Sequence, residues 1–316
     1  LKSTRFIDQG KLHGFIDISG TVGNPRLFGE LNLVDVSLNK VGLYQAAMGF
    51  QFSDNQLSLN SVTIARNQQV LYSCSGVYHF NSDNMDFQIA GNETDLNATI
   101  TAFLNKPELL EGKGVADLRV QGKLRNPQFS GNLDLKNGKL GIFQFDRIFL
   151  DIGEDQAKDS SDVLLSNGNL EPNGINLKQA VITRSGQFQM QAMGRIPFAT
   201  DQSLNISNKG KGNILSILPE LTPFFKETSS DGQWLFSLNG RPNNLAISAG
   251  KIVLRDGYLR LGDVAPEIKN IALDMELEQD GFLNVKVISG KIKGKQFAFK
   301  NARSVSTTEE ALAPFE

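Results

Sequence analysis

Apolar and polar residues alternate along most of this chain. Clear examples are "QLSLNSVTI" at 56–64, "DFQIAG" at 86–91 and "FLNVKVISG" at 282–290. A period of two places the apolar side chains on one face of a strand and the polar ones on the other. Gly, Asn, Asp and Pro separate these runs at short intervals, a spacing typical of antiparallel sheets. The sequence therefore predicts an all-β, mainly antiparallel fold.

Two segments depart from this alternation and predict a few short helices. In 95–112, apolar residues recur at helical spacing behind Asp95, which suits an N-cap position. Segment 213–228 has a similar spacing, but Pro219 and Pro223 limit it to short or kinked helix.

One block of sequence occurs three times. It begins at Gly20 as "GTVGNPRLFGELNLVDVSLN", at Gly122 as "GKLRNPQFSGNLDLKNGKLG" and at Gly240 as "GRPNNLAISAGKIVLRDGYLRLG". The second copy follows the first by 102 residues (122 − 20), and the third follows the second by 118 (240 − 122). Both helical segments precede their block by 26 residues, from Leu96 to Gly122 and from Ile214 to Gly240. This regularity indicates internal repetition of a helix-plus-strands unit.

The repeat divides the chain into three predicted modules. They cover 1–94, a truncated β-module, and 95–212 and 213–316, each a helix plus a β-module. We expect them to form one continuous elongated sheet rather than independent domains.

An Asn-Gly or Asp-Gly pair interrupts the alternation inside the repeated block. After Asn137-Gly138 the apolar phase shifts by one, so Leu135 and Leu140 are an odd number of residues apart. Both residue types accept the positive φ of a type I′ turn, so we predict a hairpin there that pairs Leu135 with Leu140. Asp256-Gly257 and Asp35-Val36 predict the same turn, although Val36 suits it poorly. A bulge within a single strand would also shift the phase and remains the alternative.

A sheet with one apolar face must cover that face or use it. One solution is a β-sandwich or closed barrel whose faces bury each other. The other is a curled sheet with an open hydrophobic groove built from repeated modules. For the second solution we predict eight groove residues: Leu31, Leu33, Leu133, Leu135, Leu140, Ile252, Leu254 and Leu259.

The motif "GxxxNPxxxGxLxLxxGxL", preceded by a helix and a "GxxxLxVxG" strand, resembles the AsmA-like superfamily, and most of all its translocation and assembly module B (TamB) branch. The closest similarity lies at 215–261, and the motif-bearing parts are 12–50, 95–145 and 213–262. The sequence departs from the pattern at Val36 and in "RPNN", where Pro precedes Asn.

The resemblance implies a β-taco fold whose groove is proposed to conduct phospholipid between the inner and outer membranes. It also implies a periplasmic rod, anchored in the inner membrane by a segment outside this chain, and a partner barrel of the outer-membrane Omp85 type, similar to TamA. We therefore regard the chain as an excised piece or mature fragment of a longer protein.

Composition narrows the function further. The net charge of −2 gives no electrostatic reason to expect nucleic acid. Cys74, the only cysteine, reads as a small strand residue, and His13 and His79 have no evident partner. We find no catalytic, phosphate-binding or metal-binding motif, so we predict no enzyme, cofactor or metal site. The acidic segment 151–162 lacks the EF-hand spacing, so we predict a solvated loop there rather than a calcium site.

The predicted sheet and the resemblance leave three classes of function open. The first is a lipid conduit that binds acyl chains. The second is a scaffold for outer-membrane proteins that acts through sheet edges. The third is a carbohydrate-binding repeat, which would need aromatic platforms such as Trp234.

Overall fold

The computed structural model describes residues 7–38, 41–93, 95–98, 101, 110–141, 143–153, 174–197, 202–241, 244–262, 266–277 and 282–304. These residues form almost entirely antiparallel strands with short helical turns, which confirms the all-β class. The chain divides into two compact units, residues 1–178 (unit 1) and 179–316 (unit 2). The boundary lies within strand β10 (Gly174–Arg184).

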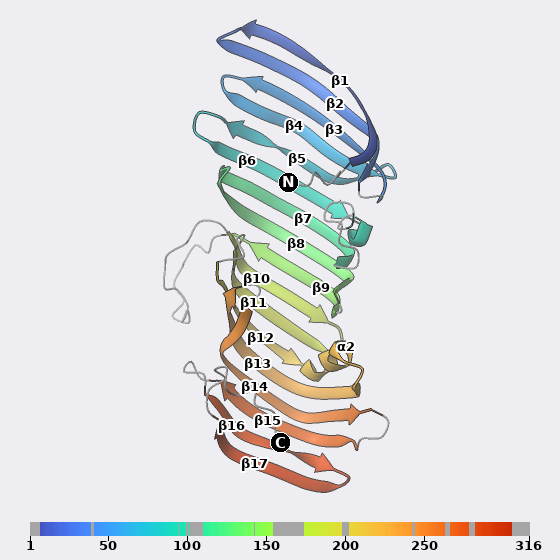
Figure 1. The fold of residues 1–316 in the computed structure, drawn as a ribbon, viewed down its shortest axis with the longest axis vertical. Helices are drawn as coiled ribbons and strands as arrows, with labels where there is room; N and C mark the ends of the chain where they lie inside the picture. Colours follow the sequence, from blue (N-terminus) through green and yellow to red (C-terminus); the bar gives the residue numbers. More distant parts are fainter. Residues whose placement is uncertain are drawn as a thin grey trace. The chain divides into compact units, whose positions relative to one another are not determined.

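In unit 1, antiparallel strands pair in chain order and curve along their length (Figure 1). The strands are β1 (Ile7–Thr21), β2 (Asn24–Leu38), β3 (Val41–Ser53), β4 (Gln56–Arg66), β5 (Gln69–His79), β6 (Asn84–Glu93), β7 (Leu110–Lys123), β8 (Asn126–Leu140) and β9 (Phe143–Ile152).

In unit 2, the strands from β11 onward likewise pair with their neighbours in sequence. They are β11 (Phe188–Pro197), β12 (Leu204–Gly212), β13 (Phe225–Arg241), β14 (Asn244–Leu261), β15 (Ile268–Leu277), β16 (Leu283–Ile292) and β17 (Lys295–Ser304). Between β12 and β13 lie a 3₁₀ turn, η1 (Ile214–Ile217), and one α-helical turn, α2 (Leu218–Leu221).

The predicted hairpin at Asn137-Gly138 is wrong. Both residues lie within β8, where Leu135 pairs with Gly114 on one side and Ile148 on the other. Asn137 takes a φ of 49°, and the register with β7 shifts nearby, so the chain bulges without reversing. The alternative of a bulge within one strand is the observed one.

The same correction holds for the two other copies. Asp35 lies within β2 with a φ of 56°, and Asp256 lies within β14 with a φ of 50°. Val36 lies beside Gly10 of β1, where an added Cβ would come within 3.2 Å of Val36 Cγ2. Bulges bend a strand and increase its twist, so these three positions contribute to the curvature of the sheets.

Two-residue reversals with positive φ occur at other places. Asp54-Asn55 joins β3 to β4 and Asn67-Gln68 joins β4 to β5, with both residues of each pair at φ between 50° and 66°. These φ values at both central positions are those of type I′ turns.

The helical predictions are confirmed in part. Residues 110–112, at the end of the first predicted segment, belong to β7, and residues 225–228, at the end of the second, belong to β13. Asp95 accepts a hydrogen bond from the backbone N–H of Ala98 (3.1 Å), as an N-cap does, and residues 96–98 are helical. Residues 102–109 of this predicted helix lie outside the described residues. In the second segment, η1 and α2 end at Leu221, before Pro223, and β13 begins at Phe225.

Equivalent elements recur at the interval that the sequence repeat shows. β4 ends at Arg66 and β10 ends at Arg184, which is 118 residues later (184 − 66). The helical turn follows Asp95 in one unit and Asn213 in the other, again 118 apart (213 − 95). The division into modules 1–94, 95–212 and 213–316 remains a sequence prediction.

Candidate functional site

The register of unit 1 aligns apolar residues in rows that cross all nine of its strands from β1 to β9. Residues paired across strands lie on the same face of a sheet. One row reads Gly14, Leu31, Met48, Val62, Cys74, Ile89, Leu118, Gly131 and Ile152. The adjacent row on that face reads Leu12, Leu33, Ala46, Ile64, Tyr72, Gly91, Ala116, Leu133 and Leu150. Neither row contains a charged residue, and we call this surface the apolar face of unit 1.

The opposite face of the same strands is polar. The row between the two above reads His13, Asn32, Ala47, Thr63, Ser73, Ala90, Asp117, Asn132 and Asp151. Ion pairs lie on this face, including Arg119 with Asp86 (2.6 Å) and Arg147 with Asp134 (2.8 Å). The alternation predicted from sequence therefore separates two chemically different surfaces.

The apolar face of unit 1 is not sealed by the described residues. Leu31, Val62, Ile89 and Leu118 are half-buried, whereas a sandwich interior would bury them fully. On β1 the face is more open still, with Leu12 61% exposed. The described strands form an open curled sheet, and the closed sandwich or barrel considered from the sequence is not observed.

The eight predicted residues divide by exposure. Leu31, Leu33 and Leu133 lie in the rows of unit 1 and are half-buried, and Ile252 and Leu259 in unit 2 are also half-buried. The remaining three differ from these: Leu135 is 6% exposed, Leu254 is 5% exposed, and Leu140, which follows the bulge, is 47% exposed. The structure thus brings Leu31, Leu33 and Leu133 onto one surface, while Leu140 pairs with Leu110 and Phe143 at the strand end.

Unit 2 has an apolar face of its own, built in the same way. One row reads Phe188, Gly212, Gly232, Leu254, Leu273, Ile288 and Phe299. The next reads Met190, Gly210, Trp234, Ile252, Met275 and Val285. Trp234 packs on Gly210 and contacts Phe188 edge-on at 6.3 Å, and it is 4% exposed. A buried indole cannot serve as an exposed sugar platform, so Trp234 gives the carbohydrate-binding alternative no support.

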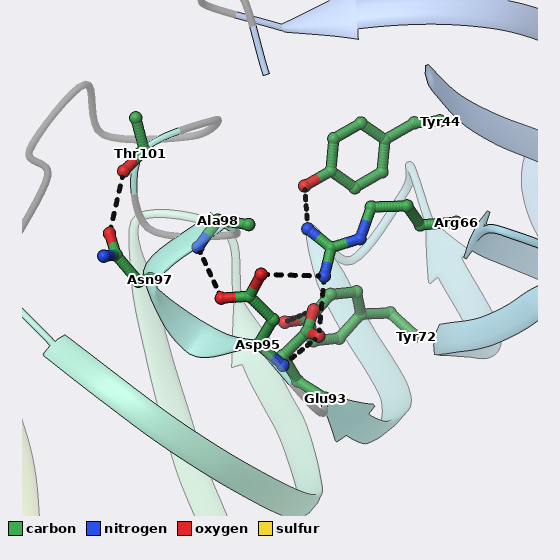
Figure 2. A network of polar contacts seen from close by, with 8 residues as sticks. All are labelled: Tyr44, Arg66, Tyr72, Glu93, Asp95, Asn97, Ala98 and Thr101. Atoms are coloured by element: carbon green, nitrogen blue, oxygen red, sulfur yellow. Dashed lines mark hydrogen bonds and ion pairs between the residues drawn. The ribbon is translucent and has the colours of Figure 1, made fainter. Parts of the chain in front are cut away.

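A polar network lies at the ends of β3–β6 in unit 1 (Figure 2). Arg66 donates to the hydroxyl of Tyr44 (3.4 Å) and to Glu93 (3.4 Å), and its guanidinium lies 3.6 Å from Asp95. Glu93 is 2% exposed and also accepts a hydrogen bond from the Tyr72 hydroxyl (3.3 Å). Buried charges require such partners.

This network holds the start of the helical turn against the strands. Glu93 also accepts a hydrogen bond from the backbone N–H of Asp95 (2.8 Å), and Asp95 caps the turn at Ala98. In unit 2 the corresponding helical turn is held by an ion pair between Arg184 and Glu220 of α2. The sequence reading missed both arginines, although their shared interval of 118 residues was a usable signal.

Metal-ligating side chains do not cluster in the described part of the chain. No three His, Cys, Asp or Glu side chains among those residues gather to hold a metal ion. Burial raises the pKa of the Cys74 thiol, which disfavours the reactive thiolate. Asp151 ends β9, and residues 154–162 of the acidic segment lie outside the described residues. Among the described helices, none has the length and apolar character needed to cross a membrane.

Comparison with known protein families, with curated proteins and with solved structures finds no match to this chain.

Proposed function

We propose that this chain is a segment of a bridge-like protein that conducts phospholipid between the inner and outer membranes, with acyl chains held on the apolar faces in an open groove built from repeated modules. The observation that carries the proposal is the uncharged row of apolar residues across nine strands of unit 1, left half-exposed. Water contacts such a surface at a free-energy cost, and an amphiphile removes that cost.

The energetics suit transport rather than storage. Each methylene removed from water contributes about 0.8 kcal/mol. Successive positions along the rows present similar apolar side chains, so an acyl chain can move between them without a deep trap. No charged group in the two rows of unit 1 would oppose this movement.

The exposed fractions of the predicted groove side chains separate those that can contact lipid from those that cannot. Leu31, Leu33, Leu133 and Ile252 are half-buried and can offer area to an acyl chain. The more deeply buried Leu135 and Leu254 pack within the sheet, and we assign them a structural role. Headgroups would remain in solvent along the open side.

The cellular setting of this proposal comes from the sequence resemblance. It comprises a periplasmic location, an inner-membrane anchor outside this chain and an outer-membrane partner of the Omp85 type. No cofactor, metal or catalytic residue is required, because partitioning into an apolar surface involves no bond making.

Neighbouring residues on opposite faces of β8 give a matched test. Leu133→Asp places a charge on the apolar face, and Asn132→Asp places the same charge on the polar face one residue away. Lipid that co-purifies with each variant is extracted and quantified by mass spectrometry, with the urea midpoint as a folding control. We expect Leu133→Asp to lose most of the lipid while Asn132→Asp retains it. Equal lipid in both folded variants would contradict the proposal.

A second candidate function is supported by β1. This strand is the outermost strand of unit 1 (Figure 1), and Leu12, Ile16 and Ile18 are 61%, 51% and 75% exposed. Long apolar edge strands can pair with a strand of another chain. A scaffold that templates outer-membrane strands would be disabled by Ile16→Pro and unaffected by Leu133→Asp, and a lipid conduit would respond in the opposite way.

A further inference from the structure

The polar face of unit 2 carries a hollow of about 630 Å³ over strands β11–β14. Leu235, which is 53% exposed, is among the residues that line it. Register pairs Leu235 with Lys209 on one side and with Lys251 on the other. Since neighbouring strands are about 4.8 Å apart, these two lysines flank the leucine across about 10 Å.

The adjacent row of the hollow has a related composition. Lys211 pairs with Gln189 on β11 and with Gln233 on β13. Gln191 pairs with Lys209 in the first row. We call Lys209, Lys211 and Lys251, with Leu235 between them, the lysine patch.

The lysine patch has no ion-pair partner among the described residues. On the next strand, β15, Glu276 pairs in register with Lys251, and Asp274 pairs with Val253. Glu276 forms an ion pair with Lys286 (2.7 Å). This ion pair, with a weaker contribution from Lys251, lowers the pKa of Glu276 below its ordinary value. Lys209 and Lys211 lie two strands farther away from these carboxylates. Asp231 on β13 lines an adjoining hollow together with Lys211 and offsets part of its charge.

The equivalent place in unit 1 has the opposite character. There the register pairs Ala90 with Asp117 and Asp117 with Asn132, where unit 2 has Lys209, Leu235 and Lys251. The row changes from a formal charge of −1 to +2, and its central carboxylate becomes an exposed leucine. General requirements of a two-faced sheet do not explain this, because unit 1 satisfies them without lysines.

We propose that the lysine patch is a docking site for an acidic peptide segment of a partner protein, one with carboxylates on either side of an apolar side chain. The carboxylates match Lys209, Lys211 and Lys251, and the apolar side chain covers Leu235. The three glutamine amides lining the hollow can both donate to and accept from a peptide backbone. The surface is hollow, which a flat anionic membrane fits poorly.

The test uses the full chain and a fluorescein-labelled peptide in which glutamate alternates with leucine, measured by fluorescence anisotropy at 50 mM salt. The variant Lys209→Gln/Lys211→Gln/Lys251→Gln removes the patch. The control, Lys291→Gln/Lys293→Gln/Lys295→Gln, removes the same charge from the β16–β17 turn of the same unit. We expect the patch variant to bind at least about tenfold more weakly and the control to bind as the unaltered chain does.

Further results decide between a peptide site and its alternatives. Leu235→Ser is expected to weaken binding, whereas Leu221→Ser, at another exposed leucine of unit 2, is expected to leave it unchanged. Equal affinity for a peptide with glutamine in place of glutamate, or equal losses in the two triple variants, would overturn the proposal. Patch-dependent binding to vesicles containing anionic phospholipid, without patch-dependent peptide binding, would overturn it in favour of a lipid surface.

Discussion

Replacing Arg66 with methionine removes the cation that two carboxylates of unit 1 share. Glu93 is 2% exposed and would lose its cationic partner in a site that is largely closed to water, which is costly for a carboxylate. The contacts that it keeps include the Tyr72 hydroxyl at 3.3 Å and the backbone N–H of Asp95 at 2.8 Å. Methionine preserves most of the apolar stem of the arginine, so the variant isolates the loss of charge.

Removing one partner of a buried pair typically costs about 3–5 kcal/mol. We place Arg66→Met near the lower limit, because Glu93 retains two hydrogen bonds and the pair itself is 3.4 Å long. A loss of about 3 kcal/mol corresponds to roughly a hundredfold larger population of opened unit 1.

Each unit can be followed by its own probe. Cys74 is only half-buried, so a thiol reagent can reach it without opening of unit 1; hydrogen exchange of the backbone amides of β4–β6 is therefore used for that unit. Trp234, the only tryptophan, is buried in unit 2 and reports on that unit. We expect Arg66→Met to accelerate the exchange in β4–β6 about a hundredfold and to leave the urea midpoint of Trp234 fluorescence unchanged.

The double variant Arg66→Met/Glu93→Gln separates charge from packing. If the uncompensated carboxylate is the cause, neutralising it recovers at least half of the lost protection. Unchanged amide exchange in β4–β6 of Arg66→Met would refute the reasoning. So would a double variant no better protected than the single one.

Three further predictions concern local geometry and pH. Gly138→Ala puts a Cβ about 2.2 Å from the carbonyl oxygen of Glu111, so we expect a loss of roughly 1–3 kcal/mol in unfolding free energy by urea titration; no loss would contradict the bulge geometry. Gly210→Ala puts a Cβ 2.1 Å from the Trp234 ring and should red-shift its emission, whereas an unshifted spectrum would contradict the packing. Burial opposes the charge of Asp134, but its arginine and lysine partners outweigh burial, so its pKa lies below the ordinary 3.8. The contribution of Asp134, about 0.2–1 kcal/mol, should therefore be present at pH 6 and vanish as pH falls below 3.8; a wild-type advantage over Asp134→Asn that persists at pH 2 would contradict this.

The alternation predicted the strands and their faces well, because side-chain period is a local property of the chain. The turn at Asn137-Gly138 was misassigned because a type I′ turn and a bulge both use a residue with positive φ. What separates the two is whether Leu135 pairs within its own hairpin or with Gly114 and Ile148. That information is not contained in the local sequence.

Long-range features limited the prediction of the site in a similar way. Arg66 and Glu93 are 27 residues apart, and nothing in the sequence around either residue marks it as buried. The exposure difference between Leu133 and Leu135, two residues apart on the same strand, depends on how the sheet curves and packs around them. Pattern alone assigns both residues to one face and cannot rank them.

Site-specific photocrosslinking along β8 tests most directly whether acyl chains occupy the apolar face. A photoreactive phenylalanine analogue is placed in turn at positions 129, 130, 132, 133 and 134, in chain isolated together with its bound lipid; Gly131 is left unchanged because an added Cβ would lie 2.0 Å from the carbonyl oxygen of Asp117. Crosslinks to acyl chains are predicted to be strong at 129 and 133 and absent at 130, 132 and 134. A uniform pattern, or no lipid crosslinks at any position, would contradict the account.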